Sequence, residues 1–259
     1  TTKLFVKCSF VHKKLRSLNQ AGLVEKFVDS LIWVIYPVWL LQVGFDLKSV
    51  GLLTAAYGLT WGGVQLFTGA ISDWLGRKPM IIVGMLGCAL SLALMPSLKD
   101  FQSQFILALS TGLSMAILYP TLLAGVADWS HSHWRGKTIG IYRFWRDLGY
   151  GIAALSMATL ASLFGNLEVV FYGVAVALTL STIEVAIRYK EYIPRPRYWK
   201  TVGESIRLLN KESRVLIIDV REEWEFAKGH IDEAINIPLE NLCHSNLKEV
   251  LDPETTYLL

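Results

Sequence analysis

The sequence has little charge for its length. Only 18% of its 259 residues are charged and 53% are hydrophobic, with a mean hydropathy of +0.39. Soluble globular domains carry roughly 25% charged residues. This composition therefore argues against a wholly soluble protein and indicates lipid as the solvent of much of the chain. The net charge of +3 is too small to indicate nucleic-acid binding.

Cysteine is also scarce. The three cysteines, Cys8, Cys88 and Cys243, have no metal-like spacing such as CxxC and no accompanying histidine cluster, so we predict no metal site and no cofactor. The N-terminal residues lack the pattern of a cleavable signal peptide. The sequence begins Thr-Thr without Met and stops in an apolar strand. We interpret it as a fragment cut at both ends.

Long windows of the sequence are almost free of charge. There are six such windows, at residues 27–45, 49–72, 79–98, 101–127, 148–167 and 169–183. The first contains one acid, Asp29, and the other five contain no charged residue. Each window is close to the ~20 residues that a helix needs to cross a bilayer. We therefore predict six transmembrane helices.

Basic residues alternate between rich and poor connections along these windows. They are frequent before the first window, between the second and third, between the fourth and fifth, and after the sixth. The connection between the first and second windows holds only Lys48, and the one between the third and fourth holds only Lys99. The connection between the fifth and sixth windows holds no basic residue. Because basic loops stay in the cytoplasm, we predict a plasma (inner) membrane protein in which both ends of this segment are cytoplasmic.

Glycine and proline indicate where the predicted helices touch or bend. Gly58 and Gly62 have the small-xxx-small spacing that lets helices approach closely in lipid. Pro37 and Pro120 fall inside the first and fourth predicted helices. Each removes a backbone hydrogen bond, so we expect a kink at each position.

The connection between the second and third windows is the most specific motif. It reads GAISDWLGRKP from Gly69 to Pro79. Gly76 permits a tight turn, and Asp73 can accept hydrogen bonds at a neighbouring helix N-terminus. The basic pair that follows Gly76 holds the turn in the cytoplasm.

This connection resembles the signature loop of the major facilitator superfamily, Gly-x-x-x-Asp-(Arg/Lys)-x-Gly-Arg-(Arg/Lys). The matching residues are Gly69, Asp73, Gly76, Arg77 and Lys78. Trp74 departs from the pattern because a basic residue is usual there, which puts a full charge relay in doubt. Residues 135–151 also resemble the family's entry into the fifth helix of a six-helix half, and the resemblance covers roughly residues 20–190.

The resemblance implies a secondary transporter with twelve helices in two halves and a substrate path between them. It also implies that the signature loop stabilises one state of alternating access. This chain holds one half. A cytoplasmic segment follows the sixth helix, so we assign it to the C-terminal half and expect a six-helix N-terminal half in the same protein.

Ionisable residues in or beside the windows are candidates for transport. Arg143, Arg146 and Asp147 near the start of the fifth helix can form a gate or bind an anion, and Arg143 and Asp147 share a face. Alternatively, they anchor the helix at the interface. Asp29, four residues after Glu25, is a candidate for proton coupling, although we expect it near the cytoplasmic mouth. The partners expected are the lipid bilayer and a small solute with a coupled proton.

Composition changes after Arg188. We divide the chain into a cytoplasmic basic segment (residues 1–20), the six-helix bundle (21–190), a stiff proline-containing linker (191–201) and a further domain (202–259). Within the last domain, strands alternate with helices, which predicts a parallel sheet. The strands are expected at 215–218, 235–238 and from 257, and the helices at 202–210, 222–228 and 239–250.

The strings IDVRE, EFAKGHI and AINIP between residues 218 and 238 resemble a rhodanese-like domain. The motif residues are Asp219, Arg221, Gly229, His230, Asn236 and Pro238. Such domains carry sulfur on a cysteine, which the resemblance places after the strand at Tyr257, beyond this sequence; Cys243 does not match it. We interpret Asp219, Arg221 and His230 as groups that support the fold and not as catalytic groups.

The sequence thus predicts an all-α polytopic membrane helix bundle followed by a partial α/β rhodanese-like domain. The expected function is secondary active transport by alternating access, with the rhodanese-like segment as an accessory or regulatory module and no enzymatic activity. The alternative is a membrane-tethered sulfurtransferase whose helices are an anchor. Six helices exceed what an anchor needs, which favours the transporter.

Overall fold

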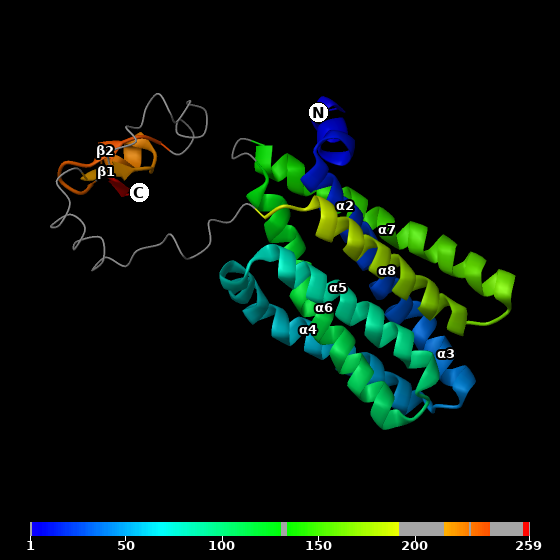
Figure 1. Ribbon diagram of the computed structural model, residues 1–259. Helices are drawn as coiled ribbons and strands as arrows, with labels where there is room; N and C mark the ends of the chain where they lie inside the picture. The colour runs from blue at the N-terminus through cyan, green and yellow to red at the C-terminus, as the bar shows by residue number, and fades with distance from the viewer. Residues whose placement is uncertain (1, 131–133, 192–214, 228, 239–255, 259) are drawn as a thin grey trace. The chain divides into compact units, whose positions relative to one another are not determined.

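The computed structural model describes residues 2–130, 134–191, 215–227, 229–238 and 256–258. The chain divides into two compact units, Thr1–Ile193 and Pro194–Leu259. In the described residues the first unit is helical and the second contains a small sheet (Figure 1).

Six long helices make up the described part of the first unit. The first consists of three consecutive pieces, α2 (Lys13–Ser30), the π-helical turn η2 (Leu31–Ile35) and α3 (Tyr36–Val43). The others are α4 (Leu47–Leu75), α5 (Arg77–Leu94), α6 (Phe101–Asp128), α7 (Arg135–Phe164) and α8 (Glu168–Arg188). Short helices α1 (Thr2–Val6) and η1 (Lys7–Val11) precede α2, and the 3-10 turn η3 (Met95–Ser97) follows α5. The predicted six-helix bundle is confirmed.

Four of these helices, within the described residues, are long and apolar enough to cross a membrane: α5 with η3, α6, α7 and α8. The other two differ in composition. The first helix is divided by η2 and carries Glu25, Lys26 and Asp29, and α4 contains several glycines. Both of these helices supply side chains to the interior site described below, together with α6 and α7.

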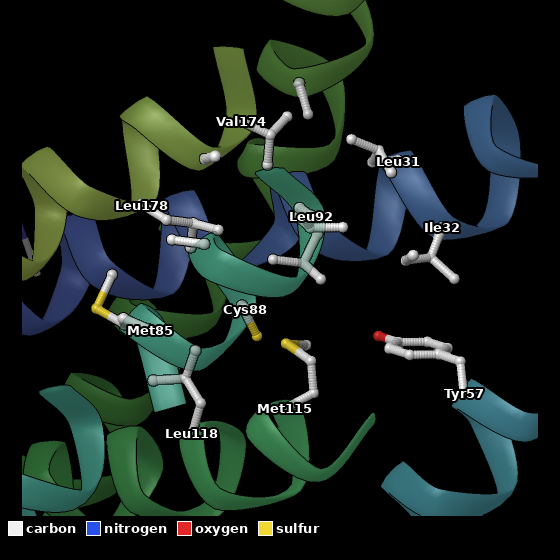
Figure 2. Close-up of a cluster of buried hydrophobic side chains, with 14 of the residues drawn as sticks. Leu31, Ile32, Tyr57, Met85, Cys88, Leu92, Met115, Leu118, Val174 and Leu178 are labelled. Atoms are coloured by element: carbon white, nitrogen blue, oxygen red, sulfur yellow. The ribbon is translucent and has the colours of Figure 1, made fainter. Parts of the chain in front are cut away.

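The bundle core is formed by side chains from helices that are distant in the sequence. Figure 2 shows Met85, Cys88 and Leu92 of α5 beside Met115 and Leu118 of α6. Val174 and Leu178 of α8 and Leu31, Ile32 and Tyr57 complete the labelled cluster. By contrast, α7 is largely exposed along its apolar stretch. Such a surface fits lipid or another protein segment.

Close helix approaches occur at glycines other than the predicted pair. A Cβ at Gly84 would lie 2.9 Å from Cβ of Leu118, and one at Gly112 would lie 2.6 Å from the carbonyl oxygen of Tyr57. Around Gly62, no described atom lies within 4 Å of a built Cβ. The predicted helix contact is found at Gly58, where a built Cβ would lie 3.4 Å from the ring of Trp33, and is wrong at Gly62, which lies on an open face of α4.

Both prolines disturb the regular helical hydrogen bonding, as expected. The π-helical turn η2 ends immediately before Tyr36 and Pro37. In α6, Pro120 has no N–H to donate to the carbonyl of Ala116. Thr68 of α4 donates its hydroxyl to that carbonyl at 2.6 Å. A buried polar group freed by proline is thus satisfied by the neighbouring helix.

The connections lie at two opposite ends of the bundle. At one end, Lys99 pairs with Glu168 at 2.7 Å and joins the α5–α6 and α7–α8 connections. At the other end, Arg77 at the α4–α5 turn pairs with Asp128 at the end of α6, at 3.1 Å. We call this second end the basic end. Lys78 and Lys99 therefore lie at opposite ends of α5, as the charge alternation requires.

In the second unit the described residues form a parallel sheet in the order β2-β1-β3. The elements are β1 (Val215–Asp219), α10 (Glu223–Phe226), β2 (Ile235–Asn236) and β3 (Thr256–Leu258). Ile218 is in register with Ile235, and Val215 with Thr256. The predicted parallel α/β arrangement is confirmed. Cys243 and the helices expected at 202–210 and 239–250 lie outside the described residues.

Candidate functional site

Helices α2 and α7 bring four charged side chains together inside the bundle. The side chains of Glu25, Lys26 and Asp29 are 0%, 1% and 1% exposed, and that of Arg146 is 14% exposed. The ammonium of Lys26 lies 3.3 Å from Glu25 Oε1 and also donates to Asp29. Arg146 donates its Nε to Glu25 Oε2 at 3.1 Å. We call these four residues the charge quartet.

Glycines let the two helices approach closely enough for the charge quartet to form. A Cβ at Gly149 of α7 would lie 3.0 Å from Cβ of Lys26. A Cβ at Gly22 of α2 would lie 2.9 Å from Cζ of Tyr142, one helical turn before Arg146. Larger residues at either glycine would separate α2 from α7, so the sequence positions the charged groups through these two contacts.

Two tyrosine hydroxyls fix Asp29 well inside the bundle. Tyr57 of α4 donates to Asp29 Oδ1 at 2.7 Å, and Tyr150 of α7 donates to Oδ2 at 3.2 Å. Tyr57 precedes Leu75 by 18 residues, which places it roughly 27 Å from the basic end. The expectation that Asp29 lies near the mouth of the bundle is wrong, because the first helix begins at Lys13 and Asp29 lies deep within it.

Aromatic rings surround both cations of the charge quartet. The ammonium of Lys26 lies 5.1 Å from the ring centre of Tyr150, 5.9 Å from that of Trp61 and 6.0 Å from that of Tyr119. The guanidinium carbon of Arg146 lies 4.4 Å from the ring centre of Tyr119. These rings stabilise the positive charges where water is scarce.

Several buried polar atoms beside the charge quartet have no hydrogen bond. Among the described residues these include the hydroxyl of Tyr142, the indole N–H of Trp61 and Oε1 of Glu25. Tyr142 itself is 1% exposed. Buried polar groups are nearly always hydrogen-bonded, so unpaired ones mark a place for water or for a bound solute.

The predicted transport residues fall into two groups. Asp29 and Arg146 belong to the charge quartet, whereas Arg143 and Asp147 are exposed on α7. Asp147 is 66% exposed and lies 4.0 Å from Arg146, and within residues 134–191 no ion pair joins it to Arg143. Arg143 and Asp147 thus lie on one face of α7 as expected from their spacing, but they form no ion pair with each other within these residues.

The sequence does not single out Lys26 as a site residue, and it indicates Glu25 only as a neighbour of Asp29. Both precede the charge-poor window that begins at residue 27, so a search for uncharged stretches leaves them outside the membrane. The available signal is the spacing of Glu25 and Asp29, which places two acids on one helical face with a base beside them.

The signature loop forms a second site at the basic end. Gly76, with φ of +98°, separates α4 from α5 in a conformation that favours glycine. The guanidinium of Arg77 donates to Asp73 and Ser72, and its Nε donates to Asp128 at 3.1 Å. One arginine therefore joins the ends of α4 and α6 to the start of α5.

The last turn of α8 and the segment that follows it also contact the signature loop. Lys78 donates to the carbonyl oxygen of Ala186 at 2.6 Å, and the backbone N–H of Arg77 donates to the carboxylate of Glu191. Glu191 thus caps the N-terminus of α5, a role that the sequence does not reveal. We call the residues that meet here the loop cluster: Asp73, Gly76, Arg77, Lys78, Asp128 and Glu191.

Two other positions of the signature loop play smaller parts. The carbonyl oxygen of Gly69 accepts the hydroxyl of Ser72 at 2.8 Å. Trp74, which stands where a basic residue is usual, is 72% exposed. Its side chain makes no contribution to the ion pairs of the loop cluster, which are complete without a base at this position.

The rhodanese motif residues bond to one another at the ends of β1 and β2. Arg221 donates to Asp219 at 2.6 Å and to the carbonyl oxygen of Gly229 at 2.9 Å, and its hydrogen bonds hold the pKa of Asp219 below its ordinary value. Asn236 donates to the carbonyl oxygens of Asp219 and Arg221 at 3.0 and 2.8 Å. His230 stacks on Phe226 with ring centres 3.8 Å apart.

The remaining motif residue, Pro238, is buried. In the part of the chain that the structure describes, no group of three or more His, Cys, Asp or Glu side chains could hold a metal ion.

Comparison with known protein families identifies two matching families. The family model of the Major Facilitator Superfamily matches residues 21–228. The chain belongs to the major facilitator superfamily. The model of the Rhodanese-like domain matches residues 201–259 and so overlaps the first match. The chain is thus a membrane transporter segment that continues into a partial rhodanese-like domain, and its family members move small solutes across membranes.

Relatives of known sequence are transporters too. The quinolone resistance protein NorA of Staphylococcus aureus is 28% identical over 111 residues, which cover 43% of this chain and 29% of NorA. The MFS-type transporter YitZ of Bacillus subtilis is 23% identical over 155 residues, which cover 60% of this chain and 94% of YitZ.

Solved structures show the same fold. The human organic anion transporter MFSD10 aligns with a TM-score of 0.58 and 18% identity over 70% of this chain and 48% of MFSD10. The peptide transporter POT in complex with sulfate aligns with a TM-score of 0.59 and 18% identity over 75% of this chain and 42% of POT. The superfamily chain described here spans less than half the length of these structures and 29% of NorA.

Proposed function

We propose that the complete protein is a secondary active transporter that moves a small solute by alternating access, coupled to protons at the charge quartet. The observation that carries this proposal is the burial of Glu25, Lys26 and Asp29 at 1% exposure or less inside a membrane bundle. Charged groups at this depth destabilise a membrane protein unless they serve a pathway or pair closely. Family membership supports transport as that role.

A second six-helix segment of the same protein completes the path in this proposal. Side chains next to the charge quartet face outward: Trp33 is 49% exposed, Tyr150 is 45% exposed and Asp147 is 66% exposed. Trp33 contacts Tyr57, whose hydroxyl bonds to Asp29. An N-terminal half would cover this face and enclose a solute between the two halves.

The loop cluster stabilises one state of the transport cycle in this proposal. It ties α4, α5, α6 and the end of α8 together at the basic end. The abundance of basic residues supports a cytoplasmic position for this end at the plasma membrane, with both ends of the chain on that side. Breaking the loop cluster would then favour the state that opens toward the cytoplasm.

The rhodanese-like segment is an accessory or regulatory module of the transporter. The bonds of Asp219 with Arg221 and Gly229 support a structural role for these motif residues. The competing function is a membrane-tethered sulfurtransferase, which the family match at residues 201–259 favours. In that case the complete protein would transfer sulfur from thiosulfate to cyanide and move no solute.

Reconstitution of the complete protein into liposomes tests the proposal. An imposed pH gradient should drive accumulation of at least one solute from a panel of small anions, cations and zwitterions. Glu25→Gln and Asp29→Asn should abolish gradient-driven accumulation while leaving solute exchange intact. Glu168→Gln, which breaks an exposed pair at the opposite end, is the matched control. Accumulation in Glu25→Gln and Asp29→Asn equal to that of the unaltered protein would refute coupling at the charge quartet.

A further inference from the structure

We infer that the charge quartet binds one monovalent anion together with one proton, so that both the empty and the loaded site are electrically neutral. This inference rests on the proposed transport function and names its solute class. In the structure, the two carboxylates of Glu25 and Asp29 face the two cations of Lys26 and Arg146. The empty site therefore carries no net charge.

Neutrality matters because the charge quartet is shielded from water. Three of its side chains are at most 1% exposed, and a net charge in a low-dielectric interior is strongly destabilising. An anion that binds alone would leave the site with one negative charge, and a cation or proton alone would leave one positive charge. A monovalent anion and a proton together restore neutrality.

The proton has a defined place to bind. Oε2 of Glu25 accepts from Arg146 at 3.1 Å, whereas Oε1 accepts no hydrogen bond among the described residues and lies 3.3 Å from the ammonium of Lys26. Both oxygens of Asp29, by contrast, already accept hydrogen bonds from Lys26, Tyr57 and Tyr150. A proton can therefore add to Oε1 of Glu25, with its electron pair supplied by that oxygen, without breaking a hydrogen bond, and it weakens the ion pair of that oxygen with Lys26.

Protonation of Glu25 releases positive charge for the anion. Lys26 and Arg146 each lose one negatively charged partner, and the guanidinium of Arg146 can then bind a planar anion with two oxygens. Arg146 is the member of the charge quartet with measurable exposure, at 14%, and so is the one that a solute can reach.

Unpaired donors around the charge quartet match a solute rich in acceptors. The hydroxyl of Tyr142 and the indole N–H of Trp61 are buried without hydrogen-bond partners among the described residues. Tyr142 lies one helical turn before Arg146 on α7 and packs against α2 at Gly22, one turn before Glu25. A small carboxylate or a monovalent oxyanion would satisfy such donors, whereas an organic cation offers them no acceptor.

Besides Glu25, ionisable groups from five helices belong to the charge quartet or interact with its members or with Tyr142 beside it. They are Lys26 and Asp29 of α2, Tyr57 of α4, Cys88 of α5, Tyr119 of α6, and Tyr142, Arg146, Asp147 and Tyr150 of α7. On the α8 side, the contact is between the uncharged side chains of Gln20 and Ser181. Among the charged members of this set, only Asp147 lies outside the charge quartet, and it is exposed.

Anion binding to the complete protein in detergent tests the inference. Thermal stabilisation by formate and nitrate, measured between pH 5.5 and 8, should give an apparent affinity that rises about tenfold for each unit decrease in pH, because one proton binds with each anion. Glu25→Gln should make this affinity independent of pH. Glu184→Gln, which alters an acid paired with Arg16 and Arg188 at the basic end, should keep the pH dependence.

A second measurement covers the case in which Glu25→Gln does not fold. In liposomes loaded with a pH-sensitive dye, formate or nitrate should carry protons inward at a rate that a potassium–valinomycin potential does not change. The inference would be overturned if the unaltered protein bound neither anion, preferred sulfate or choline, or bound these anions with an affinity independent of pH. A proton flux that follows the membrane potential would overturn it as well. Gradient-driven transport of another solute in the same liposomes would leave the proposed function standing.

Discussion

In the charge quartet, neither carboxylate is more than 1% exposed, whereas Asp73 and Asp128 of the loop cluster are 67% and 29% exposed. Both groups join helices that are distant in the sequence, and both pair acids with arginine and lysine. Water can replace a lost partner in the loop cluster. Inside the bundle these side chains are shielded from bulk water, so each member of the charge quartet depends more strongly on the others.

The surroundings therefore set how strongly each group responds to a substitution. Removal of one partner from a buried ion pair destabilises a protein by about 3–5 kcal/mol, since an uncompensated charge is left behind. An exposed ion pair contributes about 0.2–1 kcal/mol. If the comparison is right, substitutions of the same chemical type should differ severalfold between the two sites.

The largest effect is expected from Lys26→Met. This change leaves Asp29 without its cation and Glu25 with Arg146 alone, so we expect a loss of about 3–5 kcal/mol in the free energy of unfolding. The matched change Lys78→Met removes one hydrogen bond to the carbonyl of Ala186, for which we expect a loss of about 1 kcal/mol. Denaturant unfolding in detergent micelles would measure both.

A rescue variant separates charge from packing in this experiment. Lys26→Met combined with Asp29→Asn removes the stranded charge while keeping similar volume, so part of the lost stability should return. Equal losses for Lys26→Met and Lys78→Met, or no recovery in the double variant, would contradict the view that uncompensated charge dominates in the interior.

An intermediate effect is expected from Gly76→Ala in the loop cluster. Gly76 has φ of +98°, and an added Cβ would lie 2.5 Å from Glu191 Oε1. The backbone strain alone amounts to about 1–3 kcal/mol, because φ of +98° with ψ of 154° is a conformation nearly restricted to glycine. Glu191→Ala should relieve the steric part, so Gly76→Ala should be less harmful in that background. Lys190→Ala, an exposed neighbour, should give no relief.

The two sites also differ in how readily they can be read from the sequence. The loop cluster centres on a contiguous motif, and the match of Gly69, Asp73, Gly76, Arg77 and Lys78 is enough to locate it. The six helices follow from the charge-free windows for a similar reason, since lipid imposes one requirement on every residue of a span. Local pattern is sufficient in both cases.

The charge quartet cannot be found in this way because its members belong together only after folding. Asp29 and Arg146 are candidates from the sequence, yet no pattern in it packs α2 against α7 or bonds Tyr57 to Asp29. Glu191 presents the same difficulty, since it reaches Arg77 across 114 residues of chain. Windows without charge predict what touches lipid, and they leave out the charged residues that the bundle itself encloses.

The smallest effect is expected at the ion pair of Asp219 with Arg221, which extends the comparison to a pair outside the membrane. Arg221 lowers the pKa of Asp219 below its ordinary value. The ion pair therefore stabilises the folded unit at pH values above the pKa that Asp219 has in the unfolded chain. This stabilisation is lost as the pH falls through the lower pKa that Asp219 has in the folded unit. Hydrogen exchange of β1 amides in the whole protein, corrected for intrinsic rates, should therefore accelerate below about pH 4.

Asp219→Asn should remove this acid-dependent loss of stability. The control Asp232→Asn changes an exposed acid of the same unit and should retain the loss. Identical acid profiles for Asp219→Asn and the unaltered protein would show that ion pairs in water contribute too little to be detected, which would widen the contrast with the charge quartet further.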